Sequence, residues 1–252
     1  MRPMLALPLC AVALTVAMSA SAQETKVVIG ISGWTGFAPL TLAREAGIFA
    51  RNGLDVTIRK IPQASRHLAI ASGDIQCAAT TVETWISWNA SGIATTQIFQ
   101  LDKSYGADRM AVRNNVQKIA DLKGKRLSVG AAKSGTELNA RAILKAGGLS
   151  YTDLGKVEYL PFGESVELMK NRQLDATLQS AGLGVASIRD LASSGKIVVV
   201  PVPKDVVAKV GSAAYLPAII PAGTYTGQTA DVETAAIPNF LITQSKVPDD
   251  LA

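Results

Sequence analysis

Apolar stretches of strand length alternate with stretches of helical period along the chain, and the same order of elements occurs twice. The first copy predicts strands at 26–32, 54–61 and 75–81, with helices near 39–50 and 64–72. The second copy predicts strands at 125–130, 156–162 and 174–180, with helices at 136–147 and 164–173. The first and third strands lie 48 residues apart from Val27 to Ile75, and 47 apart from Leu127 to Leu174. The two halves therefore share one plan.

This repeated plan predicts an α/β fold. Strands that alternate with helices at these lengths form parallel sheets with right-handed crossovers, and ligands bind at the carboxyl ends of such strands. We therefore expect two lobes around a ligand cleft, with residues 23–108 as the first segment of lobe 1, 109–200 as lobe 2 and 201–252 as a return segment to lobe 1. One continuous doubly wound sheet is the alternative interpretation.

The return segment contains two apolar strand candidates punctuated by proline, "YLPAIIPAGTY" and "TAAIPNFLITQ". If both rejoin lobe 1, the chain crosses twice between the lobes. Pro248 and two aspartates follow at a point where a helix should begin. We therefore expect the sequence to be truncated at its C-terminus, with an incomplete return segment.

Residues 1–22 have the features of a secretory signal peptide. Arg2 precedes an apolar stretch, and the small residues Ala20, Ser21 and Ala22 end the segment. A membrane anchor is the alternative, but the stretch is short for a spanning helix and no cysteine follows it to accept a lipid. We expect cleavage after Ala22 and a periplasmic mature protein.

The charge of the chain is mildly basic and spread along the sequence. It has 25 Lys and Arg against 20 Asp and Glu, a formal charge of +5, and loss of Arg2 with the signal peptide leaves +4. No cluster of basic residues with interleaved aromatic residues occurs, which argues against a nucleic-acid partner. A weak attraction for small anions is compatible with this charge. We expect a monomer.

Cysteine and histidine are too scarce for most metal or nucleophilic sites. Cys10 leaves with the signal peptide, and Cys77 lies in the predicted strand "DIQCAATT", so no internal disulfide can form. We expect Cys77 to be a small buried residue, with a reactive thiol as the alternative. His67 is the only histidine, which argues against a multi-histidine metal site. Neither a metal nor a cofactor is expected.

The stretch "SVGAAKSGTELNARAIL" runs from a predicted strand into a predicted helix. A phosphate loop would place a lysine after its second glycine, but Gly135 is followed by Thr136 and Glu137. A nucleophilic serine would need a G-x-S-x-G elbow, and "LQSAG" lacks the first glycine. Ser134 with Glu137 three residues later matches a capping box. A helix start of this kind also binds small anions, and both of these interpretations stay open.

Small hydroxyl residues recur at equivalent strand ends and loops of the two copies. Because one helix terminus contributes little binding energy, several such loops must converge to hold an anion. Trp34, next to glycine and threonine, either walls this pocket or packs against the first helix. The recurring hydroxyl residues are Thr35, Thr80, Thr81, Ser134, Thr136 and Ser180.

Two sets of segments resemble known families of solute receptors. "IGISGWTGFAPLTLAREAGIFARNGLDVTIRKI", "ASGDIQCAATTVETW" and "DKSYGADRMAVRN" resemble the periplasmic binding proteins of ABC importers for nitrate, sulfonates and taurine, over about 26–125. "DLKGKRLSVGAAKSGTELNARAIL", "LPFGESVELMKNRQLDATLQSAGL", "LPAIIPAGTYTGQ" and "AAIPNFLIT" resemble the TAXI-family receptors of TRAP transporters, over about 120–252. Both families have the type II periplasmic-binding fold. Together the resemblances imply a chimera with a junction near "IADLKGKRLSVG".

The resemblances also imply site residues and a function. The ABC resemblance implies ligand binding by Trp34, Thr35, Thr80 and Thr81. The TAXI resemblance implies Ser134, Gly135, Thr136, Ser180 and Tyr215. The implied function is a non-enzymatic receptor that captures a small organic anion, a carboxylate or amino acid such as glutamate, and delivers it to the permease of a TRAP transporter.

Three other functions are weighed against this one. The first is the substrate-binding protein of an ABC importer for sulfonate, taurine or nitrate. The second is an enzyme similar to the pyrimidine-precursor synthases, against which the single His67 argues. The third is the effector domain of a transcription regulator, which would need a helix-turn-helix where this chain has a signal peptide.

Overall fold

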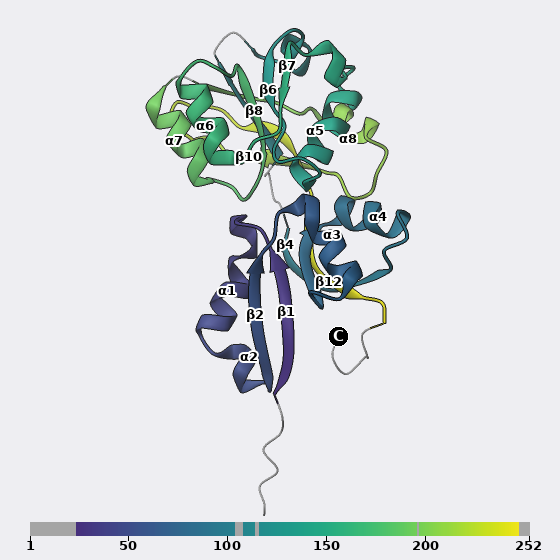
Figure 1. The fold of residues 1–252 in the computed structure, drawn as a ribbon. Coiled ribbons are helices and arrows are strands. Elements are labelled where there is room, and N and C mark those ends of the chain that lie inside the picture. The colour runs from purple at the N-terminus through teal and green to yellow at the C-terminus, as the bar shows by residue number, and fades with distance from the viewer. Residues whose placement is uncertain (1–23, 104–107, 114–115, 196, 247–252) are drawn as a thin grey trace, which may run out of the picture.

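The computed structural model describes residues 24–103, 108–113, 116–195 and 197–246. Two β-sheets with helices packed on them lie one above the other, and Figure 1 shows them as a lower and an upper lobe. The predicted signal peptide and the aspartates after Pro248 lie outside the described residues. Cleavage after Ala22 therefore stays a prediction.

The lower lobe is built on a five-stranded sheet in the order β2-β1-β3-β12-β4. Strand β1 pairs in parallel with β2 and β3, whereas β12 pairs antiparallel with β3 and β4. Its elements are β1 (Thr25–Ile31), η1 (Thr35–Phe37), α1 (Ala38–Glu45), α2 (Ile48–Arg51), β2 (Leu54–Lys60), α3 (Gln63–Ser72), β3 (Cys77–Thr81), α4 (Val82–Ala90), β4 (Thr95–Lys103) and β12 (Pro238–Gln244).

The upper lobe is built on a seven-stranded sheet in the order β10-β11-β5-β8-β6-β7, with β9 paired to β5. Strand β6 pairs in parallel with β7 and β8, and β5 pairs antiparallel with β8 and β9. Its elements are β5 (Asp108–Arg113), η2 (Ile119–Leu122), β6 (Arg126–Ser128), α5 (Gly135–Ala146), η3 (Tyr151–Asp153), β7 (Lys156–Glu158), α6 (Phe162–Lys170), β8 (Ala176–Ser180), α7 (Ala186–Ser194), β9 (Ile197–Val200), α8 (Lys204–Lys209), β10 (Leu216–Ile220) and β11 (Val232–Ala236).

The predicted repeat is present in the topology. In each lobe the first strand of the repeat lies between the second and the third and pairs in parallel with both. Because the two sheets are separate, the alternative of one continuous doubly wound sheet is wrong. The α/β fold class with two lobes is confirmed.

The return of the chain to the lower lobe occurs later than expected. Strands β10 and β11 pair with each other, and Ala235 of β11 pairs with Asp108 of β5, so both strands stay in the upper sheet. Ile220 at the end of β10 is fully buried in an upper-lobe core. Among the strands of the described residues, only β12 rejoins the lower sheet, so the strands place the return near residue 237 rather than 201. That the lobes act as separate units stays a prediction.

The helix expected at 39–50 is interrupted. Gly47 has a φ of 66°, which is left-handed backbone that glycine adopts without steric strain. The chain therefore forms two short helices, α1 and α2, instead of one.

Cys77 lies in β3 and is 6% exposed, as expected for a small buried residue. It packs with Ile29, Val56 and other apolar residues in the core between the lower sheet and α1. Burial raises the pKa of its thiol, although a hydrogen bond with Thr243 acts in the opposite direction. Because the thiolate is the reactive form, this environment disfavours a reactive role.

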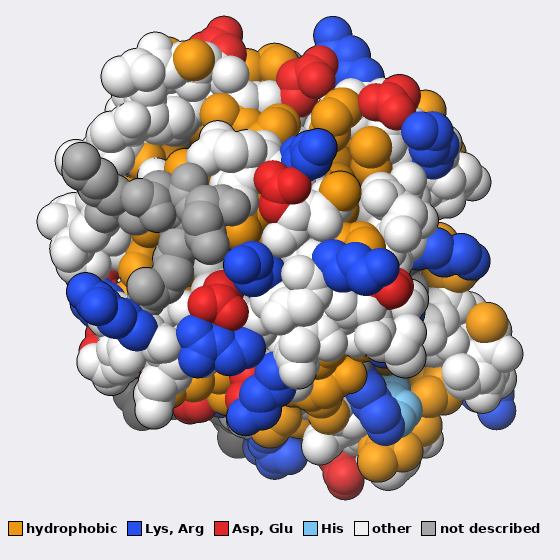
Figure 2. Space-filling view, turned by 90° about the horizontal axis from the view of Figure 1, so that it is seen from above, with side chains coloured by type: hydrophobic (Ala, Val, Ile, Leu, Met, Phe, Trp, Pro, Cys, Tyr) orange, Lys and Arg blue, Asp and Glu red, His pale blue; other side chains and the backbone are white. Residues whose placement is uncertain are grey.

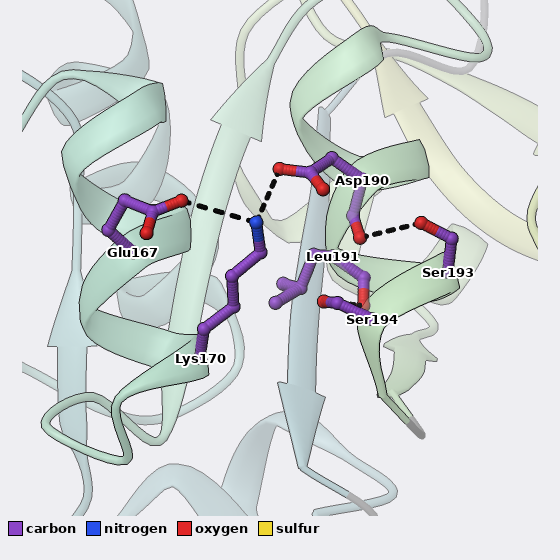
Figure 3. Close-up of polar contacts among 6 residues, drawn as sticks. All are labelled: Glu167, Lys170, Asp190, Leu191, Ser193 and Ser194. Carbon is purple, nitrogen blue, oxygen red and sulfur yellow. Dashed lines mark hydrogen bonds and ion pairs between the residues drawn. The ribbon is translucent and has the colours of Figure 1, made fainter.

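Helices α6 and α7 of the upper lobe are joined by an ion-pair cluster, which Figure 3 shows. Lys170 Nζ of α6 lies 2.7 Å from Asp190 Oδ2 of α7 and 3.2 Å from Glu167 Oε1 of its own helix. Both contacts raise the pKa of Lys170, with Asp190 the larger influence. The cluster lies on the surface, so it orients the two helices more than it stabilises the fold.

The surface of the molecule carries mixed charge. Figure 2 shows Lys and Arg side chains spread over the face seen from above, separated by acidic and uncharged side chains. In the described part of the chain, no helix is long and apolar enough to cross a membrane.

Candidate ligand-binding site

A cavity of about 610 Å³ lies between the two lobes. Most of its wall consists of places where a strand ends and a helix begins, as expected for ligand sites in sheets of this kind. The rest of the wall comes from Phe37 in η1, from Ala131, Ala132 and Asn139 beside the start of α5, from Ser180 at the end of β8, and from Ile237 and Asn239 at the crossing into β12. The strand-to-helix segments of the wall are 32–34, 62–64, 80–81, 134–136 and 161–163.

The N-termini of α3, α4, α5 and α6 meet at this cavity, because each of these helices begins at a wall segment. The first N–H groups of a helix lack partners within it and carry a partial positive charge. Two are capped: Thr81 Oγ1 accepts from Thr84 N at 3.4 Å, and Ser134 Oγ accepts from Glu137 N at 3.2 Å. Four helix starts therefore place partial positive charge at the wall of the cavity.

Only half of the predicted capping box forms at α5. Ser134 accepts from Glu137 N, but the Glu137 carboxylate turns away and accepts from Arg141 Nη2 at 2.6 Å and from Tyr151 Oη at 3.0 Å. Burial, together with the negative charge of Glu137, raises the pKa of Tyr151. Ser134 N donates instead to Ala131 O at 3.1 Å. The loop itself therefore satisfies the donor that the box would have used.

Seven of the nine predicted site residues line the cavity, and two do not. Thr35 is exposed in η1, outside the wall. Tyr215 is buried behind the wall, where its hydroxyl donates to Asn139 Oδ1 at 2.8 Å. Ligand binding by any of the nine stays a prediction. The residues in the wall are Trp34, Thr80, Thr81, Ser134, Gly135, Thr136 and Ser180.

Two close contacts join the lobes across the cleft. Trp34 Nε1 of the lower lobe donates to the Ser180 carbonyl oxygen of the upper lobe at 2.7 Å. Gly135 approaches Thr81 so closely that a Cβ at position 135 would lie 2.3 Å from Thr81 Cγ2. The Trp34 ring also packs edge-on against Phe37, with centroids 4.8 Å apart. Trp34 therefore lines the cavity and packs against η1, the turn that precedes α1.

Two amide side chains that the sequence analysis missed bind the strand-end hydroxyls. Gln63 Nε2 donates to Thr80 Oγ1 at 2.8 Å, and Asn139 Nδ2 donates to Ser180 Oγ at 3.1 Å. Both amides line the cavity. The repeat held a signal for Gln63, because Gln63 follows the second strand of the first copy, and a strand end is where wall residues are expected. Asn139 lies one turn inside α5, and no spacing in the sequence marks it.

The chemistry of the cavity follows from its described wall residues. None of them carries a charged side chain, and their polar groups are hydroxyls and amides. The only histidine, His67, is not among them, and its ring centroid lies 6.0 Å from that of Trp88. Among the residues that the structure describes, no three His, Cys, Asp or Glu side chains could hold a metal ion together. The wall thus offers neutral donors beside an apolar surface formed by Phe37, Phe162 and Ile237.

A family model matches most of this chain. The model of the NMT1-like family matches residues 56–252, which is most of the sequence. The chain belongs to the NMT1-like family. This match spans the expected junction near residue 125, so the chimera and the TAXI character of the second half stay predictions.

Solved structures with the same fold are more distant in sequence. One from Bordetella bronchiseptica RB50 is 20% identical, with a TM-score of 0.64 over 88% of this chain and 64% of that one. The periplasmic aliphatic sulphonate binding protein SsuA from Escherichia coli is 18% identical, with a TM-score of 0.56 over 87% of this chain and 65% of that one. PhnD1 from Prochlorococcus marinus MIT 9301, in complex with methylphosphonate, is 10% identical, with a TM-score of 0.62 over 88% of this chain and 78% of that one.

These similarities confirm the two-lobed type II periplasmic-binding fold of this NMT1-like chain. The chain spans slightly less than two thirds of the length of the Bordetella and Escherichia proteins.

Proposed function

We propose that this NMT1-like protein is a non-enzymatic receptor of the periplasm, whose two lobes close on a small organic anion and deliver it to a membrane importer. The observation that carries the proposal is the cavity between the lobes, where four helix N-termini meet neutral donors. One helix terminus contributes roughly 0.3–1 kcal/mol at a surface, so convergence of several, away from bulk water, is what binding of an anion requires.

The chemistry of the wall favours an anion with an alkyl group and no ammonium group. An amino acid carries an ammonium that needs an acidic partner, and the described wall residues include no carboxylate. This argues against glutamate, and also against taurine. Phe37, Phe162 and Ile237 can cover an alkyl chain while hydroxyl and amide groups bind the oxygens. An alkanesulfonate meets both conditions.

An ABC importer is the better supported partner. The Escherichia coli protein of the same fold binds aliphatic sulfonates, and the Prochlorococcus protein holds methylphosphonate, so the fold accommodates oxyanions of this kind. Delivery of glutamate to a TRAP transporter, which the TAXI resemblance implies, stays a prediction without comparable support.

Thermal unfolding with a panel of ligands tests the proposal. We expect ethanesulfonate and hexanesulfonate to raise the melting temperature of the full chain, and methylphosphonate, taurine and glutamate to raise it less. A ligand at 100 times its Kd stabilises the folded state by about 2.7 kcal/mol, which is several degrees for a chain of this size. Hexanol serves as the uncharged control. If no anion at millimolar concentration changes the melting temperature, the proposal is wrong.

A further inference from the structure

Arg66 is a fully buried arginine on α3, directly behind the cavity wall. Its guanidinium donates to three oxygens: Gln63 Oε1, the carbonyl of Ala79, and the carbonyl of Ile61 at 2.9 Å. No carboxylate pairs with it among the residues that the structure describes, and its Nε has no hydrogen-bond partner there. The guanidinium therefore has neutral partners only.

A buried charge of this kind is normally paired. Burial lowers the pKa of Arg66 to about 10, so the side chain is still protonated at neutral pH. Removing an unpaired cation from water is costly, and most buried arginines are compensated by an acid. Within the described lower lobe, the positive charge of Arg66 has no such counter-charge.

One of the hydrogen bonds from Arg66 begins a chain that leads to the cavity. Because a guanidinium can only donate, Gln63 must turn its Oε1 toward Arg66 and its Nε2 toward Thr80 Oγ1, 2.8 Å away. Thr80 Oγ1 then accepts from Gln63, which leaves the proton of the Thr80 hydroxyl to donate elsewhere. Gln63 and Thr80 both line the cavity. A chain of hydrogen bonds that begins at a cation polarises each donor along it.

A second route brings the same charge near the cavity. The Arg66 guanidinium carbon lies 5.9 Å from the centroid of the Phe37 ring, and Phe37 is also a wall residue. The charge is thus separated from the cavity by one layer of side chains. The corresponding chain in the upper lobe, Tyr215 to Asn139 to Ser180, begins at a phenol hydroxyl instead of a guanidinium. Of these two chains, only the one in the lower lobe carries a charge.

We propose that Arg66 is the counter-charge of the cleft: a positioning residue that polarises Gln63 and the Thr80 hydroxyl and so makes the cavity select an anion over an uncharged molecule of the same shape. The inference rests on the proposed function, which it deepens by assigning the source of charge selectivity. Arg66 acts through the wall and touches no ligand.

Calorimetric binding of two ligands of similar shape tests this selectivity. The probes are ethanesulfonate and ethyl methyl sulfone, which lacks the charge. Arg66→Met should raise the Kd for ethanesulfonate roughly 10- to 100-fold and leave the Kd for the sulfone within twofold. Arg59→Met, which removes the same charge from an exposed position of β2, should change neither. Equal losses for both probes, or no loss for ethanesulfonate, would overturn the proposal while the proposed function stands.

A second variant tests the uncompensated charge without any ligand and also covers the case in which Arg66→Met folds poorly. Gln63→Glu places a carboxylate where Gln63 Oε1 meets Arg66 Nη1. In the otherwise wild-type chain we expect it to raise the melting temperature by roughly 2–4 °C, a result that does not need the Arg66→Met protein. A lower melting temperature would mean that Arg66 is already compensated, and would overturn the proposal. If ethanesulfonate does not bind but Gln63→Glu behaves as expected, the proposed function fails for this ligand and the unpaired charge of Arg66 is supported.

Discussion

Trp34 belongs to the core of the lower lobe and to the wall of the cleft at the same time. Its ring packs on Phe37, and a Cβ at Gly36 would lie 1.7 Å from Trp34 Cζ3, so glycine at 36 is what leaves room for the ring. In this position Nε1 points at the Ser180 carbonyl of the other lobe, 2.7 Å away. A side chain that packs in one lobe thus makes a hydrogen bond to the other.

Replacing Trp34 with phenylalanine separates these roles. Trp34→Phe keeps an aromatic ring in the wall but removes the bond to Ser180, so the closed arrangement loses one interlobe hydrogen bond. We expect the Kd for ethanesulfonate to rise roughly 2- to 10-fold, corresponding to about 0.5–1.5 kcal/mol for one neutral bond, as measured by calorimetry. The matched control is Trp85→Phe, which removes a similar bond, to Thr95 O at 3.2 Å within the lower lobe. If both variants bind alike, the interlobe bond has no role in binding.

At the scale of elements, the repeat reuses one contact at the start of its third strand. Val28 N of β1 donates to Gln76 Oε1 at 2.9 Å, and Arg126 N of β6 donates to Asp175 Oδ2 at 2.9 Å. In both lobes a side chain just before the third strand satisfies an N–H of the first strand. In the upper lobe that side chain is a carboxylate, and Arg126 Nε also donates to it at 2.9 Å.

This carboxylate makes the upper lobe sensitive to acid. Hydrogen bonds from Arg126 hold the pKa of Asp175 at about 2, below the roughly 3.9 of an unfolded chain. The pair therefore stabilises the fold above about pH 4, and this contribution is lost as the pH falls toward 2. We expect Asp175→Asn to lower the free energy of unfolding by about 1–2 kcal/mol at pH 7, after allowing for solvent screening. Urea unfolding from pH 7 to pH 2.5 should show the difference from wild type shrinking.

Asp205→Asn is the control for this series. Asp205 pairs with Lys209 on the exposed surface of α8, so its loss should change stability little. If the free energy of unfolding of Asp175→Asn stays below that of wild type by the same amount down to pH 2.5, the linkage argument is contradicted, because the difference would then come from packing.

The start of α5 is one of the places where the two lobes lie in close contact. Gly135→Ala would place a methyl group within 2.3 Å of Thr81 Cγ2, which forces the two lobes apart at this point. We expect the Kd for ethanesulfonate to rise at least about tenfold, with the melting temperature of the free protein almost unchanged, because the clash exists only when the lobes are close. Gly195→Ala is the control, since a Cβ there meets nothing within 4 Å. An unchanged Kd for Gly135→Ala would show that this contact is not needed for binding.

On the scale of the whole molecule, the chain passes between the sheets after β4 and again between β11 and β12. Ile237 at the second passage is 2% exposed and also lines the cavity. The connection between the lobes is thus part of the cavity wall, and a molecule bound in the cavity would touch both lobes and their link. Binding energy can therefore favour one relative position of the lobes.

We expect this coupling to be visible as a change in size. Small-angle X-ray scattering should give a smaller radius of gyration with saturating ethanesulfonate than without it, because the ligand adds contacts only in the closed arrangement. Gly135→Ala should reduce the change and Gly195→Ala should keep it. A radius of gyration that stays constant while calorimetry shows binding would mean that the lobes are already closed in the free protein.

The sequence by itself determined the repeat, the α/β class and most of the wall, because periodicity and turn residues are local signals and strand ends in such a repeat fall at one edge of a sheet. Thr80, Thr81, Ser134 and Ser180 could be found in this way. Only the tertiary structure decided which side chains stand behind the wall and which strand returns. Arg66 looks like an ordinary helix residue in the sequence until packing buries it. Strand β10 looks like a return strand until antiparallel pairing with β11 keeps it in the upper sheet, whereas the second predicted return segment does rejoin the lower sheet as β12. Burial and long-range pairing depend on contacts between distant segments, which local patterns do not encode.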